Sequence, residues 1–286
     1  MDNPRLGSSI DQLHDRQARI EQRKNQEAVE QLDLFLANNT CLPNQREVPN
    51  AFLRGALFPA IGKNSSKQML TRERIASLEG VEIIYTGQRL NQDHLTVWCN
   101  LIHLMKAKKT GHKFTFKGGE YFALTNKSDG GKNYEVLLVQ LSQLQATTVE
   151  IQQGSYVYSG SFISEAARDN ETKQFSIDLN PRLVALFEPN HFTRMNWLIR
   201  EELQRKALAL WLMGFYSSHS EPYAYKIESI MHLSGSEASS PKDFAKTTLK
   251  RALSAVQQAS EKYGKKFFFE VKNGKLSVSK SKPFLS

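Results

Sequence analysis

Cysteine is scarce in this sequence. Only Cys41 and Cys99 occur among the 286 residues, and neither belongs to a CxxC pair or stands beside clustered histidines. These features argue against a disulfide framework and against a structural zinc site. They fit a protein of the reducing cytoplasm, which is the location we expect.

Long apolar runs are also missing. The N-terminal residues lack the apolar segment of a signal peptide. The most apolar stretch, Ala207 to Phe215, is shorter than the roughly 20 residues that cross a bilayer. This stretch therefore predicts a core helix.

Catalytic signatures are absent as well. The sequence contains neither a GxxxxGK[ST] phosphate-binding loop nor a GxSxG nucleophile motif, and none of its seven histidines is spaced as a metal ligand. We therefore expect no enzymatic activity, no cofactor and no bound metal.

Positive charge is abundant and unevenly placed. The formal net charge is +9, and the segment from Pro241 to the C-terminus has eleven Lys or Arg against three Asp or Glu. Such a block can neutralise phosphates and release counterions, which makes nucleic acid the first partner to consider. A membrane surface is the second, and a solvated face without a partner stays open.

The chain divides by pattern into three parts. Residues 1–47 contain good helix formers with few apolar anchors, so we expect a marginal helix or a flexible N-terminal arm. Residues 48–190 form a predicted first domain and residues 191–286 a second.

The first domain alternates strands and helices. Apolar periodicity and turn residues predict strands at 81–85 and 114–116, and helices at 119–126 and 132–144. A helix with Asp93 as its cap carries Val97, Trp98 and Leu101 at helical spacing. Three further strand-like segments, TTVEIQ, SYVYSGSFIS and FSIDLN, follow the helix at 132–144.

The second domain repeats this order. We predict a long helix at 192–217, a strand at 223–227, a short helix at 228–233 and a helix from Pro241, capped by Ser240, to Tyr263. A β-hairpin then turns at Asn273-Gly274, the pair that a type I′ turn favours. Phe267, Phe269 and Val271 are expected to pack on the helices.

Helix, short strand, helix, helix and hairpin thus occur twice. This order is that of a winged helix, so the predicted fold class is α+β with two tandem winged-helix domains after a flexible arm. An α+β domain of another topology stays open.

The third helix of each unit carries the candidate DNA contacts. In the first unit Asn133, Val136, Gln140 and Gln143 fall opposite the leucines, and Asn or Gln can hydrogen-bond adenine edges in the major groove. Lys132, just before them, is a further candidate contact. A solvated polar face is the alternative.

The second unit has a stripe of cations. Lys242, Lys246 and Lys250 recur every four residues with Arg251 beside them, and such like charges repel unless phosphates neutralise them. Lys272 and Lys275 flank the hairpin turn, where a wing would contact the DNA backbone. We predict that all six bind DNA.

The segment QLDLF comprises Gln31, Leu32, Asp33, Leu34 and Phe35. Its apolar side chains would be a liability in a flexible arm unless something buries them. Either a partner protein or the chain's own folded domain can do so.

QLDLF is similar to the pentapeptide by which bacterial replication proteins bind the sliding clamp of the replicative polymerase. With VPN–RGALF at 48–58, YTG at 85–87, Asp93 and Trp98, LQAT at 144–147 and FYSSHSEPY at 215–223, the chain resembles the TrfA-type plasmid replication initiators.

The resemblance implies a tandem winged-helix initiator that binds repeated origin sites, called iterons, as a monomer. Such proteins help to melt an adjacent A+T-rich segment and recruit the host helicase, host initiator and sliding clamp, and their dimers are inactive for initiation. Carried over, Gln31, Leu32, Leu34 and Phe35 would contact the clamp, and Asp33 stands where the family often has Ser or Asp. The basic positions of the last helix differ, so the iteron sequence does not transfer.

We therefore expect an origin-binding initiator of double-stranded DNA. A winged-helix transcriptional repressor is the first alternative, although QLDLF argues against it. A DNA-nicking or DNA-joining enzyme is the second, and it would need a metal cluster or an activated nucleophile.

Overall fold

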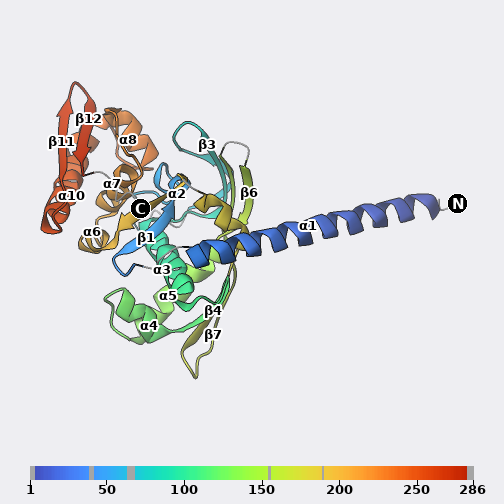
Figure 1. Ribbon diagram of the computed structural model, residues 1–286. Helices are drawn as coiled ribbons and strands as arrows, with labels where there is room; N and C mark the ends of the chain where they lie inside the picture. The colour runs from blue at the N-terminus through green and yellow to red at the C-terminus, as the bar shows by residue number, and fades with distance from the viewer. Residues whose placement is uncertain (1–3, 39–41, 63–67, 154–155, 189, 282–286) are drawn as a thin grey trace.

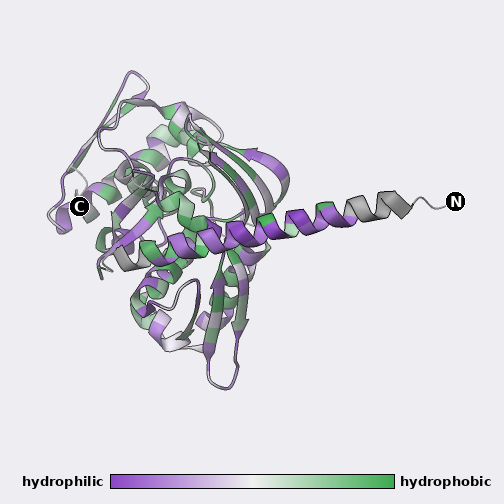
Figure 2. Ribbon diagram, turned by 45° about the vertical axis from the view of Figure 1, so that its right-hand side comes forward, coloured by the Kyte–Doolittle hydropathy of each residue, from purple (hydrophilic) through white to green (hydrophobic). Residues whose placement is uncertain are grey.

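The N-terminal segment is one long helix. The computed structural model describes residues 4–38, 42–62, 68–153, 156–188 and 190–281, and within them α1 (Pro4–Asn38) extends far from the body (Figure 1). Figure 2 shows that the extended part is largely hydrophilic. Its last turns pack on η2 (Pro181–Phe187), a 3-10 helix, and bury Ala28 and Leu32.

Of the two expectations for this segment, a marginal helix or a flexible arm, the structure shows the helix, and its last turns are held on the body. Arg182 of η2 donates to Asn25 Oδ1 at 3.0 Å and pairs with Glu21 of α1. Because the docking surface lies about 160 residues away in sequence, the local pattern of few apolar residues could not reveal it.

Two antiparallel sheets form the first half. The order in the larger sheet is β2-β3-β5-β6, with strands β2 (Met69–Ile75), β3 (Val81–Gln88), β5 (Thr148–Gln153) and β6 (Tyr156–Ser161). The order in the smaller sheet is β4-β8-β7, with strands β4 (Lys113–Lys117), β7 (Ile163–Arg168) and β8 (Gln174–Leu179). The strands expected in this half are present, except that the segment SYVYSGSFIS is divided between β6 of the larger sheet and the start of β7 of the smaller one.

Three helices accompany these sheets: α3 (Gln92–Lys108), α4 (Gly118–Leu124) and α5 (Gly131–Ala146). The N-cap of α3 is Asn91, so the prediction of Asp93 as its cap is wrong. Asn91 Oδ1 accepts hydrogen bonds from the backbone N–H groups of Asp93 and His94, while the His94 ring accepts from Asn91 N–H at 3.1 Å. This reciprocal pair is a capping box made by Asn and His.

The predicted helix at 192–217 is wrong in its first part. The segment contains β9 (Phe192–Asn196), α6 (Trp197–Glu202) and α7 (Ala207–Ser217). β9 pairs antiparallel with β1 (Gln45–Pro49), so a strand from the start of the folded region satisfies its backbone. Sequence periodicity carries no signal for that distant partner.

The rest of the second half is β10 (Tyr225–Lys226), α8 (Ile227–Leu233), α9 (Pro241–Asp243), the π-helical turn η3 (Phe244–Leu249), α10 (Lys250–Lys262), β11 (Phe267–Lys272) and β12 (Lys275–Lys280). Its sheet has the order β10-β12-β11. The predicted hairpin turn is confirmed, since Asn273 and Gly274 have φ of 53° and 70°. Phe267 is buried as expected, but Val271 is exposed, which corrects its predicted packing on the helices.

The two halves share one hydrophobic core, and α2 (Asn50–Leu53) with the residues after it makes part of the contact between them. Arg54 donates to Ser218 at the end of α7, and Trp211 Nε1 donates to the Gly55 carbonyl at 2.9 Å. Ala60 N–H reaches the Ser234 carbonyl at 2.7 Å. These contacts fix the candidate DNA-binding helices of both halves on one scaffold.

Candidate nucleic-acid interface

The helix formed by α9, η3 and α10 begins where the sequence predicted. Ser240 is the N-cap and its Oγ accepts from Asp243 N–H at 3.1 Å, while Pro241 occupies the first turn. Phe244, Leu249 and Leu253 on one face of this helix are buried in the shared core, and α10 contacts α6, α7 and β11 of the second half. The opposite face of the helix is thereby left on the surface.

The predicted cations lie on that face. Lys242, Lys246, Lys250 and Arg251 are all exposed, and none forms an ion pair with another described residue. Four neighbouring positive charges without a carboxylate partner repel one another. The structure thus brings together, on one helix face, the cations that the sequence placed on a stripe.

The hairpin adds a second group of cations. In the ladder register Lys272 of β11 stands opposite Lys275 of β12, and Lys275 stands opposite Lys226 of β10. Three exposed lysines therefore form a row across three adjacent strands; we call it the lysine row. Like charges directly opposite each other destabilise a sheet, and an anion over the row removes that cost.

Lys226 is a candidate that sequence reasoning missed. Its position depends on the pairing of a two-residue strand with β12, which no local pattern reports. Phe268 of β11 is 53% exposed and stands opposite Ser279 of β12. The hairpin tip points away from the body (Figure 1).

The predicted residues of α5 are in a different situation. Lys132 is exposed, but the Asn133 amide donates to the Ser128 carbonyl at 2.7 Å and closes a local turn. The Gln143 amide donates to Gln88 Oε1 at 2.9 Å, and its Oε1 lies 2.6 Å from His94 Nε2. The half-buried side chains of Asn133 and Gln143 thus form hydrogen bonds within the protein, to the local turn and to residues at the start of α3 and the end of β3.

Gln140 lines a groove of about 700 Å³ between the start of α3, the polar face of α5 and the α6–α7 connection. Cationic side chains on its walls are those of Lys127, Lys132, Arg200 and Arg205, and the carboxylates are those of Asp93 and Glu201. Arg200 is fully buried there, and its Nη2 donates to the Gln92 carbonyl and to Thr96 Oγ1. This ties α6 to the start of α3.

The hairpin of the first half differs in charge from that of the second. The turn between β7 and β8 carries Asp169 and Glu171, and Asp169 Oδ1 accepts from the N–H groups of Glu171 and Thr172 at 2.8 and 3.1 Å. Lys173 of the same turn lies over the ring of Tyr134. The hairpin turn of the second half is therefore the more cationic of the two.

QLDLF is helical and partly buried. Leu32 is 5% exposed, and the Phe35 ring lies 4.8 Å from the ring of Phe187, with Lys106 Nζ 4.5 Å from the Phe35 centroid. Gln31, Asp33 and Leu34 are exposed. The apolar side chains of Leu32 and Phe35 are therefore packed against the chain's own folded part, which is one of the two possibilities that the sequence left open.

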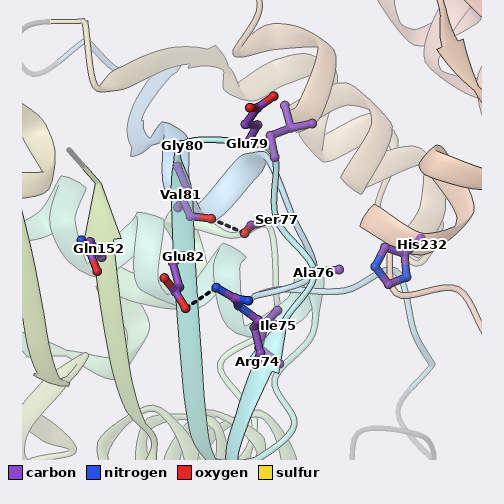
Figure 3. Close-up of a pocket in the computed structure, with 11 residues that line it drawn as sticks. Arg74, Ile75, Ala76, Ser77, Glu79, Gly80, Val81, Glu82, Gln152 and His232 are labelled. Atoms are coloured by element: carbon purple, nitrogen blue, oxygen red, sulfur yellow. Dashed lines mark hydrogen bonds and ion pairs between the residues drawn. The ribbon is translucent and has the colours of Figure 1, made fainter.

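A separate hollow lies between the β2–β3 connection and α8 (Figure 3). Arg74 pairs with Glu82 across it, and Glu79 and His232 complete its charged or titratable lining. Its two carboxylates and single arginine do not suit an anionic ligand. Elsewhere in the described ranges, no three His, Cys, Asp or Glu side chains gather as metal ligands, and no described helix is long and apolar enough to cross a membrane.

Comparison with known families decides the relationship. The sequence model of the TrfA protein family matches residues 10–259, which is most of the chain. The chain belongs to the TrfA family. A curated relative, plasmid replication initiator protein TrfA of Escherichia coli, is 26% identical over 224 residues, covering 76% of this chain and 58% of that protein. The chain thus spans little more than half the length of that relative.

Solved structures support the fold. Domains 2 and 3 of RctB align with a TM-score of 0.55 at 11% identity, covering 84% of this chain and 99% of that chain. The Pi initiator protein, in complex with iteron DNA, aligns over 82% of this chain and 96% of that chain at 13% identity, with a TM-score of 0.38, below the level that establishes a common fold.

The segments that resemble the TrfA family build the scaffold of this member. Val48 and Phe58 are fully buried, and Arg54 spans to Ser218. Tyr85 donates its hydroxyl to the Gln88 carbonyl at 2.6 Å. The cited residues of these segments are buried or hydrogen-bonded within the fold, whereas the predicted DNA-binding cations of the second half are exposed.

Proposed function

We propose that this chain is a plasmid replication initiator that binds iteron repeats in double-stranded origin DNA through two winged-helix units. Membership of the TrfA family supports the class of function. The observation that carries the DNA-binding part is the uncompensated cationic surface of the second half, formed by the helix from Lys242 to Arg251 and the lysine row.

Strand order supports the winged-helix assignment. In each half a short strand after a helix pairs with the last strand of a later hairpin, giving β4-β8-β7 and β10-β12-β11. Two further helices lie between the short strand and the hairpin in both cases. In the first half the β5–β6 hairpin is inserted after α5 and joins the sheet of β2 and β3.

The mechanism would be differential binding without a chemical step or a cofactor. Phosphate contacts fix the position of the protein, and helix residues in the major groove distinguish bases. Deforming a DNA site costs on the order of 1–6 kcal/mol, so binding to several repeats can bias an adjacent A+T-rich segment towards opening. The acidic turn at Asp169 and Glu171 implies that the second unit supplies most of the electrostatic affinity.

The test is a salt titration with two duplexes. One carries the direct repeats beside the gene for this chain, and the other has the same composition in random order. Replacing Lys246→Ala and Arg251→Ala together should weaken binding to both duplexes and lower the slope of log K against log salt by about two, as for two lost phosphate contacts.

A matched control removes the same charge elsewhere. Arg16→Ala with Lys24→Ala lies on the exposed part of α1 and should leave both affinities and the salt slope unchanged. Equal effects of the two double variants, or no effect of the first, would refute an interface on the second unit.

Recruitment of host proteins is the second part of the proposal. The host helicase and host initiator would be partners on the origin, and QLDLF would bind the sliding clamp, all within the cytoplasm, with a monomer–dimer equilibrium controlling activity. Because Leu32 and Phe35 are packed on the body, clamp binding requires the last turns of α1 to detach.

A DNA-binding repressor is the second candidate. The burial of Leu32 and Phe35 gives QLDLF a role in the fold, so the motif no longer argues against a repressor by itself. Supplying the chain in trans to an origin plasmid that lacks its own initiator separates the two. Replication supports the initiator, while repression of a reporter without replication supports the repressor.

A further inference from the structure

The helix of the second unit that carries the exposed cations contains a break in its periodicity. Phe244 and Leu249 are both 0% exposed although they lie five positions apart in the sequence. An α-helix of 3.6 residues per turn returns to the same face after three or four residues. The difference is absorbed by η3, in which the backbone is π-helical from Phe244 to Leu249.

The π turn changes which residues face solvent. In an uninterrupted α-helix Thr248, four residues after Phe244, would lie over it on the buried face. Here Lys246, Thr247 and Thr248 are three consecutive exposed residues. Leu249 takes the buried position, and Leu253 and Val256 continue at normal α spacing. One extra residue has therefore been placed on the surface without altering the core register on either side.

The exposed pair has the chemistry of base recognition. A threonine side chain offers a hydroxyl, which can contact several bases, and a methyl group, which can contact the methyl of thymine. Thr247 Oγ1 donates to the Asp243 carbonyl at 2.6 Å and lies 3.3 Å from Thr248 Oγ1, so the two side chains form one small polar and apolar surface.

The neighbours of this pair suit a different task. Lys246 precedes it, and Lys250 and Arg251 follow it on the exposed side. Phosphate contacts by such cations position a protein but carry no sequence information, so a specific interface needs other groups between them. π turns are rare overall, and those that occur often lie at functional sites. This agrees with a functional role for the turn at Phe244–Leu249.

We propose that Thr247 and Thr248 read thymine-containing base pairs of the repeat in the major groove, and that the π turn is what presents both. The inference rests on the proposed function, because it assumes that this helix enters DNA.

The first experiment compares two variants. One is the double variant that combines Thr247→Ala and Thr248→Ala, and the other is Lys246→Ala. The threonine variant should lose about five-fold or more in affinity for the repeat duplex, with unchanged affinity for random duplex and an unchanged salt slope. Lys246→Ala should weaken both duplexes and lower the slope by about one. Because all three side chains are exposed, thermal unfolding should be unaffected in both.

A second experiment isolates the methyl group. Replacing thymine by deoxyuridine in the repeat removes the thymine methyl, and Thr247→Ser with Thr248→Ser removes the protein methyls while keeping the hydroxyls. The two losses should be non-additive, because each removes one side of the same contact. Additive losses would overturn the thymine assignment.

Deleting Thr248 tests the π turn itself. The deletion brings Leu249 to four residues after Phe244, as in an α-helix, and leaves the core positions on both sides unchanged. The protein should stay folded and keep its affinity for random duplex while losing preference for the repeat. Retained preference would refute the inference. If Lys246→Ala together with Arg251→Ala also has no effect, then the proposed function fails as well, which distinguishes the two failures.

Discussion

The ring of Phe35 packs against the ring of Phe187, with the centroids 4.8 Å apart, and this contact joins the end of α1 to the body of the protein. Phe187 also stacks on Trp98 of α3 at 5.9 Å, so Phe35 belongs to an aromatic series that continues into the core. The QLDLF segment, which resembles a clamp-binding pentapeptide, thus anchors the end of α1 to the body in this structure.

Leu32→Ala should loosen that anchor. Truncating a buried leucine costs about 2–5 kcal/mol, because apolar contacts are lost and a cavity remains. We expect backbone amides in the last turns of α1 to exchange with solvent at least about 30-fold faster, which corresponds to about 2 kcal/mol of local stability. Hydrogen exchange read by mass spectrometry measures this.

Leu34→Ala is the matched control, since Leu34 is 62% exposed. Its exchange rates should equal those of the unmodified chain, while pull-down by the purified sliding clamp should fall if QLDLF binds there. Full clamp binding by Leu34→Ala and Phe35→Ala would remove the clamp from the proposed function.

Glu47→Gln should destabilise the protein strongly. Glu47 pairs with Lys106, both side chains are at most 7% exposed, and Arg194 Nε lies 3.3 Å from Glu47 Oε1. Removing one partner of a buried pair leaves an uncompensated charge and costs about 3–5 kcal/mol. Denaturant unfolding measures the loss. Glu27→Gln, which breaks the exposed pair with Arg23, should change stability by less than about 1 kcal/mol.

Stability should fall as the solution becomes acidic. Burial lowers the pKa of the His219 imidazole to about 4. The hydrogen bond to the Phe215 carbonyl opposes this shift, and the positive charges of Arg54 and Lys280 add to it. Burial likewise lowers the pKa of His103 to about 4. The unfolded chain, with a pKa near 6.5, then binds protons that the folded chain does not. The contribution of the two neutral histidines to the free energy of unfolding is complete above about pH 6.5 and is lost as the pH falls towards 4.

Denaturant midpoints at pH 7 and pH 5 check this, and His219→Gln should reduce the difference between them. His14→Gln, on the exposed part of α1, should leave the difference unchanged. A pH dependence that His219→Gln does not alter would contradict the assignment of His219.

Gly55→Ala should disturb the contact between the two halves. An added Cβ would lie 2.4 Å from the Ala76 carbonyl oxygen and 2.8 Å from Ser77 Cα, and both are backbone atoms that cannot move aside cheaply. Such overpacking costs about 1–3 kcal/mol. Thermal unfolding is the measurement, and Gly62→Ala, where an added Cβ meets nothing within 4 Å, should unfold at the original temperature.

Local patterns predicted what depends on local chemistry. The sequence correctly predicts the turn at Asn273-Gly274, the Ser240 cap with Pro241, and the apolar face of α5. Each depends on φ preference, side-chain capping or helical spacing, which act over a few residues. The block of C-terminal cations is also predictable from the sequence, because charge is a property of composition.

The tertiary structure decided everything that needs a distant partner. Residues 192–196 became a strand because β1 pairs with them, and QLDLF became an anchor because Phe187 and Lys106 receive it. Gln143 turned inward because Gln88 and His94 bind its amide. The lysine row and the exposure of Thr248 depend on strand register and on five-residue core spacing, which are fixed only when the chain packs. Sequence determines which groups are available, and packing against remote residues determines which of them remain free to bind.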